Sequence, residues 1–173
     1  MAISIAPITQ DDAADFWAAV DAVSREELYL ARLRAPPLED SQAFVANNIA
    51  RGYPQFIARD AGRLVGWCDA IGNERDLHAH CATLGMGLLP AWRGQGLGRR
   101  LIERTLTAAW EKGFLRVELT VNADNLRAQA LYRAVGFQTE GVFRRAARRG
   151  QGYVDVIAMA LLAPGMLSDG QQG

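Results

Sequence analysis

The sequence is poor in the residues that build disulfide frameworks and metal sites. It contains two cysteines and two histidines in 173 residues. Cys68 and Cys81 fall inside apparent strands, so we expect two reduced thiols in the core rather than a disulfide. His78 and His80 lack a set of cysteine or carboxylate partners at the spacing of a metal site, and no metal is therefore predicted.

Net charge and long apolar runs are also missing. Lys+Arg and Asp+Glu number 19 each, which argues against nucleic acid or a membrane surface as a partner. No run is long enough to cross a bilayer, and the N-terminal residues do not resemble a signal peptide. We therefore expect a cytoplasmic protein. Half of the residues are hydrophobic, enough for one globular domain over residues 1–163, and the polar tail 164–173 is predicted to be flexible.

The hydrophobic periodicity predicts alternating strands and helices. Residues 13–23 form a helix whose pattern continues as far as Arg34, where Ala35-Pro36-Pro37 stops it. Pro7 favours an edge position for the first strand, and Gly85 and Gly87 suggest a bulged strand. We expect strands at 3–8, 54–60, 63–70, 80–89, 115–121, 137–143 and 153–162, and further helices at 38–51, from 98 to Gly113, and from a cap at Asp124 or Asn125 to 135.

A glycine-dense turn follows the strand at 80–89 and precedes the longest helix. It reads Arg93-Gly94-Gln95-Gly96-Leu97-Gly98. Backbone N–H groups of such a turn, together with the N-terminus of the helix, form a binding site for anions and for phosphates above all. The turn lacks the Gly-Lys-Ser/Thr ending of a nucleotide-hydrolysing P-loop. Arg99 stands beyond Gly98, so the dinucleotide fingerprint is absent as well.

Two blocks of the sequence resemble the Gcn5-related N-acetyltransferase (GNAT) superfamily. The Arg-x-x-Gly-x-Gly turn between a strand and a helix resembles its acyl-CoA loop. Residues 122–137 resemble its second motif, Asn-x-x-Ala-x-x-x-Tyr-x-x-x-Gly-Phe. The resemblance covers about residues 2–162. It implies an α/β (α+β) fold with a central mixed, mostly antiparallel sheet of six to seven strands, flanked by about four helices.

The same resemblance implies an acetyl-CoA site. The backbone at Leu88 and Leu89 is expected to hold the pantetheine arm, together with Asn125. The pyrophosphate is expected on the amides of the turn, which are those of Arg93, Gly94, Gln95, Gly96, Leu97 and Gly98. Tyr132 shares a helix face with Asn125 and resembles the superfamily's general acid, which gives a proton to the leaving thiolate.

The general base is predicted less directly. The strand at 115–121 alternates cleanly, so Glu118, Thr120 and Asn122 lie on one face. Glu118 is our candidate to take the amine proton, directly or through water. An ordinary strand carboxylate without a catalytic role is an equally good interpretation. His80 is a second candidate.

The resemblance implies an N-acetyltransferase, an acyltransferase that moves acetyl from acetyl-CoA to the primary amine of a small molecule such as an amino acid or polyamine. Direct attack in a ternary complex is expected. Two alternatives remain: a protein N-terminal acetyltransferase of the ribosomal-protein type, and a non-catalytic acyl-CoA-binding module. Residues 24–38 and the last hairpin are expected to face the acceptor. The arginines at 144–149 fit a solvated hairpin end better than an RNA site, and a homodimer is one expected assembly.

Overall fold

A computed structural model describes residues 3–166. Within that part no helix has the length and apolarity needed to span a membrane. The strands are β1 (Ser4–Pro7), β2 (Gln55–Asp60), β3 (Arg63–Gly72), β4 (Cys81–Leu88), β5 (Arg116–Asn122), β6 (Gln138–Arg149) and β7 (Gly152–Leu162). The α-helices are α1 (Ala13–Ser24), α2 (Leu38–Arg51), α3 (Leu97–Lys112) and α4 (Leu126–Val135). Short 3₁₀ turns are η1 (Gln10–Asp12), η2 (Asp76–His78) and η3 (Pro90–Trp92).

All seven strands belong to one mixed sheet in the order β1-β2-β3-β4-β5-β7-β6. The neighbours pair antiparallel except β4 and β5, which are parallel and are connected through α3. The predicted fold class is thereby confirmed. β1 is an edge strand, as Pro7 indicated, because it pairs with β2 alone.

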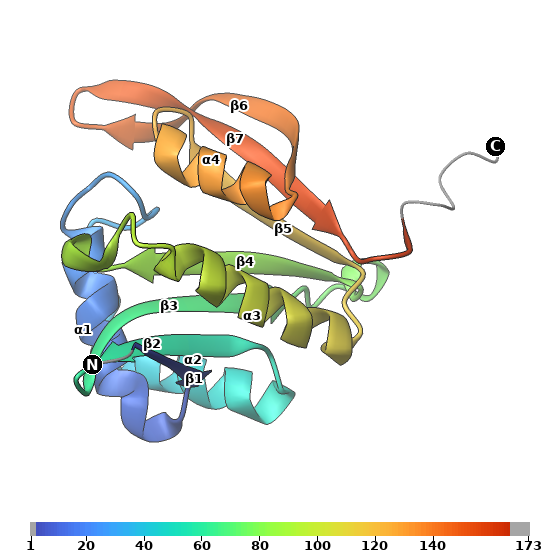
Figure 1. Cartoon of the computed structure of the whole chain (residues 1–173). Coiled ribbons are helices and arrows are strands. Elements are labelled where there is room, and N and C mark those ends of the chain that lie inside the picture. Colours follow the sequence, from blue (N-terminus) through green and yellow to red (C-terminus); the bar gives the residue numbers. More distant parts are fainter. Residues whose placement is uncertain (1–2, 167–173) are drawn as a thin grey trace.

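Helices cover both faces of the sheet, as Figure 1 shows. On one face α3 and α4 enclose the larger core, in which Leu101 and Ile102 are fully buried. On the other face α1 and α2 enclose a smaller core around Phe16, Val45 and Trp67. Alternation of side chains along β2 and β3 supplies both cores, since Phe56 and Cys68 belong to the larger core and Ile57 and Trp67 to the smaller one.

The sheet is divided at its centre. β4 and β5 pair over three positions, Cys81–Arg116, Ala82–Val117 and Thr83–Glu118. Beyond Thr83 the two strands diverge toward their C-terminal ends, and Figure 1 shows the opening between them. The backbone of β4 after Thr83 therefore has a sheet neighbour on the β3 side only, and its other edge is available to a ligand.

Three local expectations are wrong. α1 ends at Ser24 and residues 25–37 are a non-helical connection. Side chains hydrogen-bond its backbone in place of intrahelical partners, as the Asp21 carboxylate does by accepting from the Ala35 N–H at 3.1 Å. β6 continues to Arg149, beyond the expected strand end at residue 143, and its arginines lie in the part of β6 that leads into the hairpin turn to β7, as expected of a hairpin end. β4 pairs with β3 in unbroken register, so it has no bulge on that side.

The glycines of β4 have a packing reason instead. A Cβ on Gly87 would lie 2.2 Å from a Trp67 ring carbon. A Cβ on Gly85 would lie 2.9 Å from a carboxylate oxygen of Asp69. Both partners stand opposite on β3, so the large side chains of one strand occupy the space that the glycines of the other leave.

Candidate active site

A cavity of about 370 Å³ occupies the opening between β4 and β5. Its walls come from the C-terminal halves of both strands, the glycine turn, the start of α3, one face of α4 and the connection after α1. The lining residues are Val23, Tyr29, Met86, Gly87, Leu88, Arg93, Gly94, Gly96, Gly98, Arg99, Thr120, Val121, Asn125, Arg127, Ala128, Leu131 and Tyr132.

The glycine turn forms one end of this cavity. Gly94 has φ 76° and Gly96 has φ 78°, a left-handed backbone that other residues rarely adopt. α3 begins at Leu97, directly after Gly96, so the first N–H groups of the helix lack intrahelical acceptors beside the cavity. A Cβ on Gly94 would lie 2.4 Å from an Arg127 nitrogen. The absence of side chains thus leaves a cradle of N–H groups with a guanidinium above it, which suits a diphosphate.

The β4 wall presents backbone groups to the cavity. The Leu89 N–H donates to the Val65 carbonyl at 2.9 Å. Since alternate residues of a strand address opposite neighbours, the backbone groups of Met86 and Leu88 face away from β3, into the opening. The Leu88 carbonyl accepts from Arg93, at 2.9 Å from Nε and 2.7 Å from Nη2.

The α4 wall contributes Asn125 and Tyr132. The Asn125 side chain caps the helix by accepting from the Ala128 N–H at 3.1 Å. Tyr132 is 8% exposed, and its ring lies 5.9 Å from that of Phe137. Within residues 3–166 no group hydrogen-bonds the phenol. Burial raises the pKa of the Tyr132 phenol, with a smaller contribution from Cys68, so the group stays protonated near neutral pH.

The structure brings most of the predicted site residues together. Leu88, Arg93, Gly94, Gly96, Gly98, Asn125 and Tyr132 all line the cavity. Leu89 and Leu97 are buried in the two cores. Gln95 is exposed and its amide donates to the Ala91 carbonyl at 2.7 Å. The side chains of these three residues therefore have structural contacts, and the N–H of Leu89 is used within the sheet.

Glu118 lies apart from this group. Its carboxylate accepts from Arg116 at 3.1 Å and lines a neighbouring cavity of about 510 Å³. Thr120 lines both cavities. Two residues along a strand span about 7 Å, so water could connect Glu118 with the reaction space beside Thr120. His80 precedes β4 at the end where β4 and β5 pair, far along the strand from the cavity.

Two arginines at the cavity were not predicted. Arg99 lies in the first turn of α3 and pairs with Glu103 at 2.7 Å. Arg127 lies in the first turn of α4 and has no ion pair within the described part of the chain. A signal was present in the sequence, because both follow a helix start that flanks the predicted phosphate cradle. Their cationic charge there complements a polyphosphate.

A buried carboxyl lies behind the β4 wall. Asp69 on β3 is 6% exposed and stands opposite Gly85. Burial raises the pKa of Asp69 to about 7, and a hydrogen bond from the Gly85 backbone opposes this rise. Asp69 does not line the cavity, but its hydrogen bond with the Gly85 backbone links β3 to β4, the strand that does.

Comparison with known proteins agrees with this geometry. The model of the acetyltransferase (GNAT) family matches residues 17–137. An uncharacterized N-acetyltransferase from Mycobacterium tuberculosis is 38% identical over 102 residues, which cover 57% of this chain and 63% of that protein. The chain thus matches less than two thirds of the length of that relative.

Two further relatives match over a longer part of the chain. The L-amino acid N-acetyltransferase AaaT from Escherichia coli is 28% identical over 139 residues, covering 79% of this chain and 85% of that protein. A crystal structure of a GNAT-family acetyltransferase from Streptococcus pneumoniae superposes with a TM-score of 0.87 at 25% identity, covering 94% of this chain and all of the other.

Proposed function

Because the chain belongs to the acetyltransferase (GNAT) family, we propose that it transfers an acetyl group from acetyl-CoA to the primary amine of a small molecule, such as an amino acid or polyamine. The observation that carries this proposal is the cavity in the divided sheet. It joins a cradle of N–H groups, an apolar middle lined by Met86, Ala128 and Leu131, and the buried phenol of Tyr132.

This arrangement fits an extended thioester. The cradle and the two arginines suit the phosphates of coenzyme A. The backbone groups of Met86 and the Leu88 N–H suit an arm that contains amides, since they lack strand partners on that side, whereas the Leu88 carbonyl accepts from Arg93. When bound, acetyl-CoA supplies the carbonyl carbon that the amine attacks and the sulfur that leaves.

Tyr132 is proposed to assist the departing sulfur. Its hydroxyl is free to donate, and its raised pKa keeps the proton in place. A thiol has a pKa of about 8.5 in a cysteine side chain, lower than that of a phenol, so complete transfer of the proton from Tyr132 is unfavourable. The phenol therefore donates a hydrogen bond to the developing thiolate, and the thiolate takes its proton finally from solvent.

Glu118 remains the proposed base, acting through water along Thr120. The amine must lose one proton when its nitrogen bonds to the carbonyl carbon, and Glu118 is the predicted carboxylate on that strand face. We expect Glu118→Gln to lower kcat about tenfold with acetyl-CoA affinity unchanged, since a relay through water contributes less than a direct base. Steady-state kinetics over pH 6–9 test this expectation, and an unchanged kcat would remove Glu118 from the mechanism.

Direct attack on the thioester agrees with the state of the cysteines. Cys68 and Cys81 are buried, and burial raises the pKa of both thiols. Neither thiol is therefore suited to form an acetyl-enzyme, since the thiolate is the nucleophilic form. Buried thiols also keep the background low in an assay that detects free coenzyme A.

The function is tested by release of free thiol from acetyl-CoA in the presence of amino acids, polyamines, aminoglycosides and short peptides. Turnover with a small amine, together with the mass of its N-acetyl product, supports the proposal. Turnover with peptide N-termini alone would replace it by the protein-acetylating alternative. Binding of acetyl-CoA without turnover of any amine would replace it by a cofactor-binding module.

A further inference from the structure

Residues 25–36, which we call the strap, cross the mouth of the cavity. The strap follows α1 without regular secondary structure. Tyr29 lines the cavity together with residues of both β4 and β5. Glu27 has φ 56°, a left-handed conformation that costs about 1 kcal/mol or more in a residue other than glycine. Contacts elsewhere must hold this turn in place.

On the β4 side the strap is held by Arg93. The guanidinium donates to both carboxylate oxygens of Glu26, at 2.7 and 2.5 Å. It also lies 4.6 Å from the centre of the Tyr29 ring and donates twice to the Leu88 carbonyl. The side chains of Arg93 and Glu26 are 16% and 24% exposed, so water screens this pair less than a surface pair.

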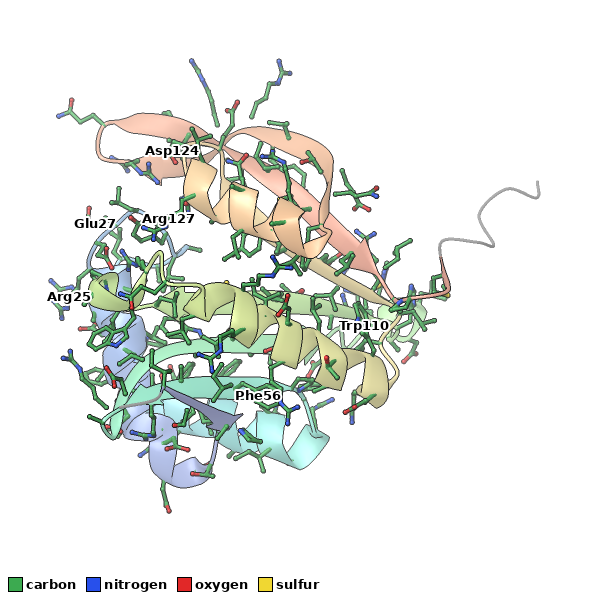
Figure 2. The ribbon with its side chains drawn as sticks, in the orientation of Figure 1. Arg25, Glu27, Phe56, Trp110, Asp124 and Arg127 are labelled. Atoms are coloured by element: carbon green, nitrogen blue, oxygen red, sulfur yellow. The ribbon has the colours of Figure 1, made fainter. Side chains whose placement is uncertain are left out.

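On the β5 side the strap is held through one carbonyl. Leu28 accepts from the Asn122 amide and from Arg149, both at 3.0 Å. Arg149 also pairs with Asp124, which precedes α4. Figure 2 shows Glu27 of the strap at the same end of the molecule as Asp124 and Arg127. The strap therefore joins the two halves of the sheet where they have no strand pairing with each other.

We propose that the Arg93 side chain is a positioning residue for the acceptor amine. Its guanidinium fixes the strap through Glu26 and Tyr29 and fixes the Leu88 carbonyl beside the thioester arm. This inference rests on the proposed acetyl transfer. It separates two roles within one residue: the backbone of Arg93 belongs to the cofactor turn, whereas its side chain shapes the space that the acceptor enters.

The two roles predict different kinetic effects. The cradle consists of backbone groups of the turn, and Glu26 does not line the cavity. Loss of the Glu26 carboxylate therefore leaves the cradle intact and loosens the strap. We expect Glu26→Gln to raise the KM of the acceptor about tenfold, which corresponds to about 1.4 kcal/mol, and to leave the KM of acetyl-CoA within about twofold. Glu26→Asp, which retains the charge, should show a smaller rise.

A matched control is available on the far side of the molecule. Glu74 pairs with Arg51 at 3.2 Å, with side chains 72% and 47% exposed. Glu74→Gln removes one Arg–Glu pair as Glu26→Gln does, and we expect both KM values to stay unchanged. A rise in acceptor KM that is no larger in Glu26→Gln than in Glu74→Gln overturns the inference. An equal rise of the acceptor KM and the acetyl-CoA KM in Glu26→Gln also overturns the inference, because it would show that the Arg93–Glu26 ion pair supports the cofactor turn.

Limited trypsin digestion tests the strap without activity. Arg32 and Arg34 are exposed strap residues. We expect cleavage after them, followed by mass spectrometry, to be about tenfold faster in Glu26→Gln than in the natural chain or in Glu74→Gln, since opening of the strap controls access. Equal cleavage rates overturn the inference. If no amine is turned over but cleavage is faster in Glu26→Gln, the proposed function is rejected, while the finding that the Arg93–Glu26 ion pair holds the strap is retained.

Discussion

The substitution Tyr132→Phe separates a chemical role of the phenol from a structural one. Phenylalanine keeps the ring that packs against Phe137, 5.9 Å away. It removes a hydroxyl that has no hydrogen-bond partner within residues 3–166. If the hydroxyl of a tyrosine is hydrogen-bonded to the protein, its removal lowers the free energy of unfolding. Removal of the Tyr132 hydroxyl breaks no such contact.

Stability and rate are expected to respond differently. Tyr132 lines the cavity and its hydroxyl has no hydrogen-bond partner within residues 3–166, so the melting temperature of Tyr132→Phe should stay unchanged within a few degrees. Loss of one donor to a developing charge typically lowers kcat by about 10²–10³. The affinity for acetyl-CoA should change little, because the hydroxyl acts only when the sulfur becomes charged.

Three measurements on one variant check this reasoning. They are steady-state thiol release, calorimetric titration with acetyl-CoA, and thermal unfolding. Loss of kcat with retained affinity and retained stability assigns the phenol to the chemical step. An unchanged kcat over the whole acceptor panel refutes the assignment, and a large loss of stability would show that an unseen contact holds the hydroxyl.

Two further predictions concern the β3–β4 pair. Burial raises the pKa of Asp69 to about 7 from an ordinary value of 3.8, so the folded chain binds one proton more than the unfolded chain between these values. The free energy of unfolding therefore falls as pH rises from about 4 to 7. Asp69→Asn should remove this pH-dependent decrease, and urea unfolding at pH 5 and pH 8 measures it. Gly87→Ala should cost about 1–3 kcal/mol in unfolding free energy, because the added Cβ would lie 2.2 Å from Trp67. Gly141→Ala is its control, since a Cβ there meets nothing within 4 Å, and equal costs would contradict the overlap.

Local signals were sufficient for most elements. The span of α2 and the end of α4 at Val135 agree with the sequence prediction, because Pro37 and two glycines mark their boundaries directly. The connection after α1 was misjudged, since its residues suit a helix and tertiary hydrogen bonds, among them those to Asp21, Arg93 and Asn122, hold it in a non-helical conformation. Propensity alone could not reveal those partners.

The sequence by itself determined the cofactor half of the candidate site. Glycine at 94 and 96 leaves backbone N–H groups accessible, and this requirement is local to a turn and a helix start. The tertiary structure alone decided that β4 and β5 separate after Thr83, that the Arg93 side chain turns toward Glu26, and that Glu118 points into a neighbouring cavity. These features depend on contacts between residues far apart in the chain, for which spacing along the sequence carries no signal.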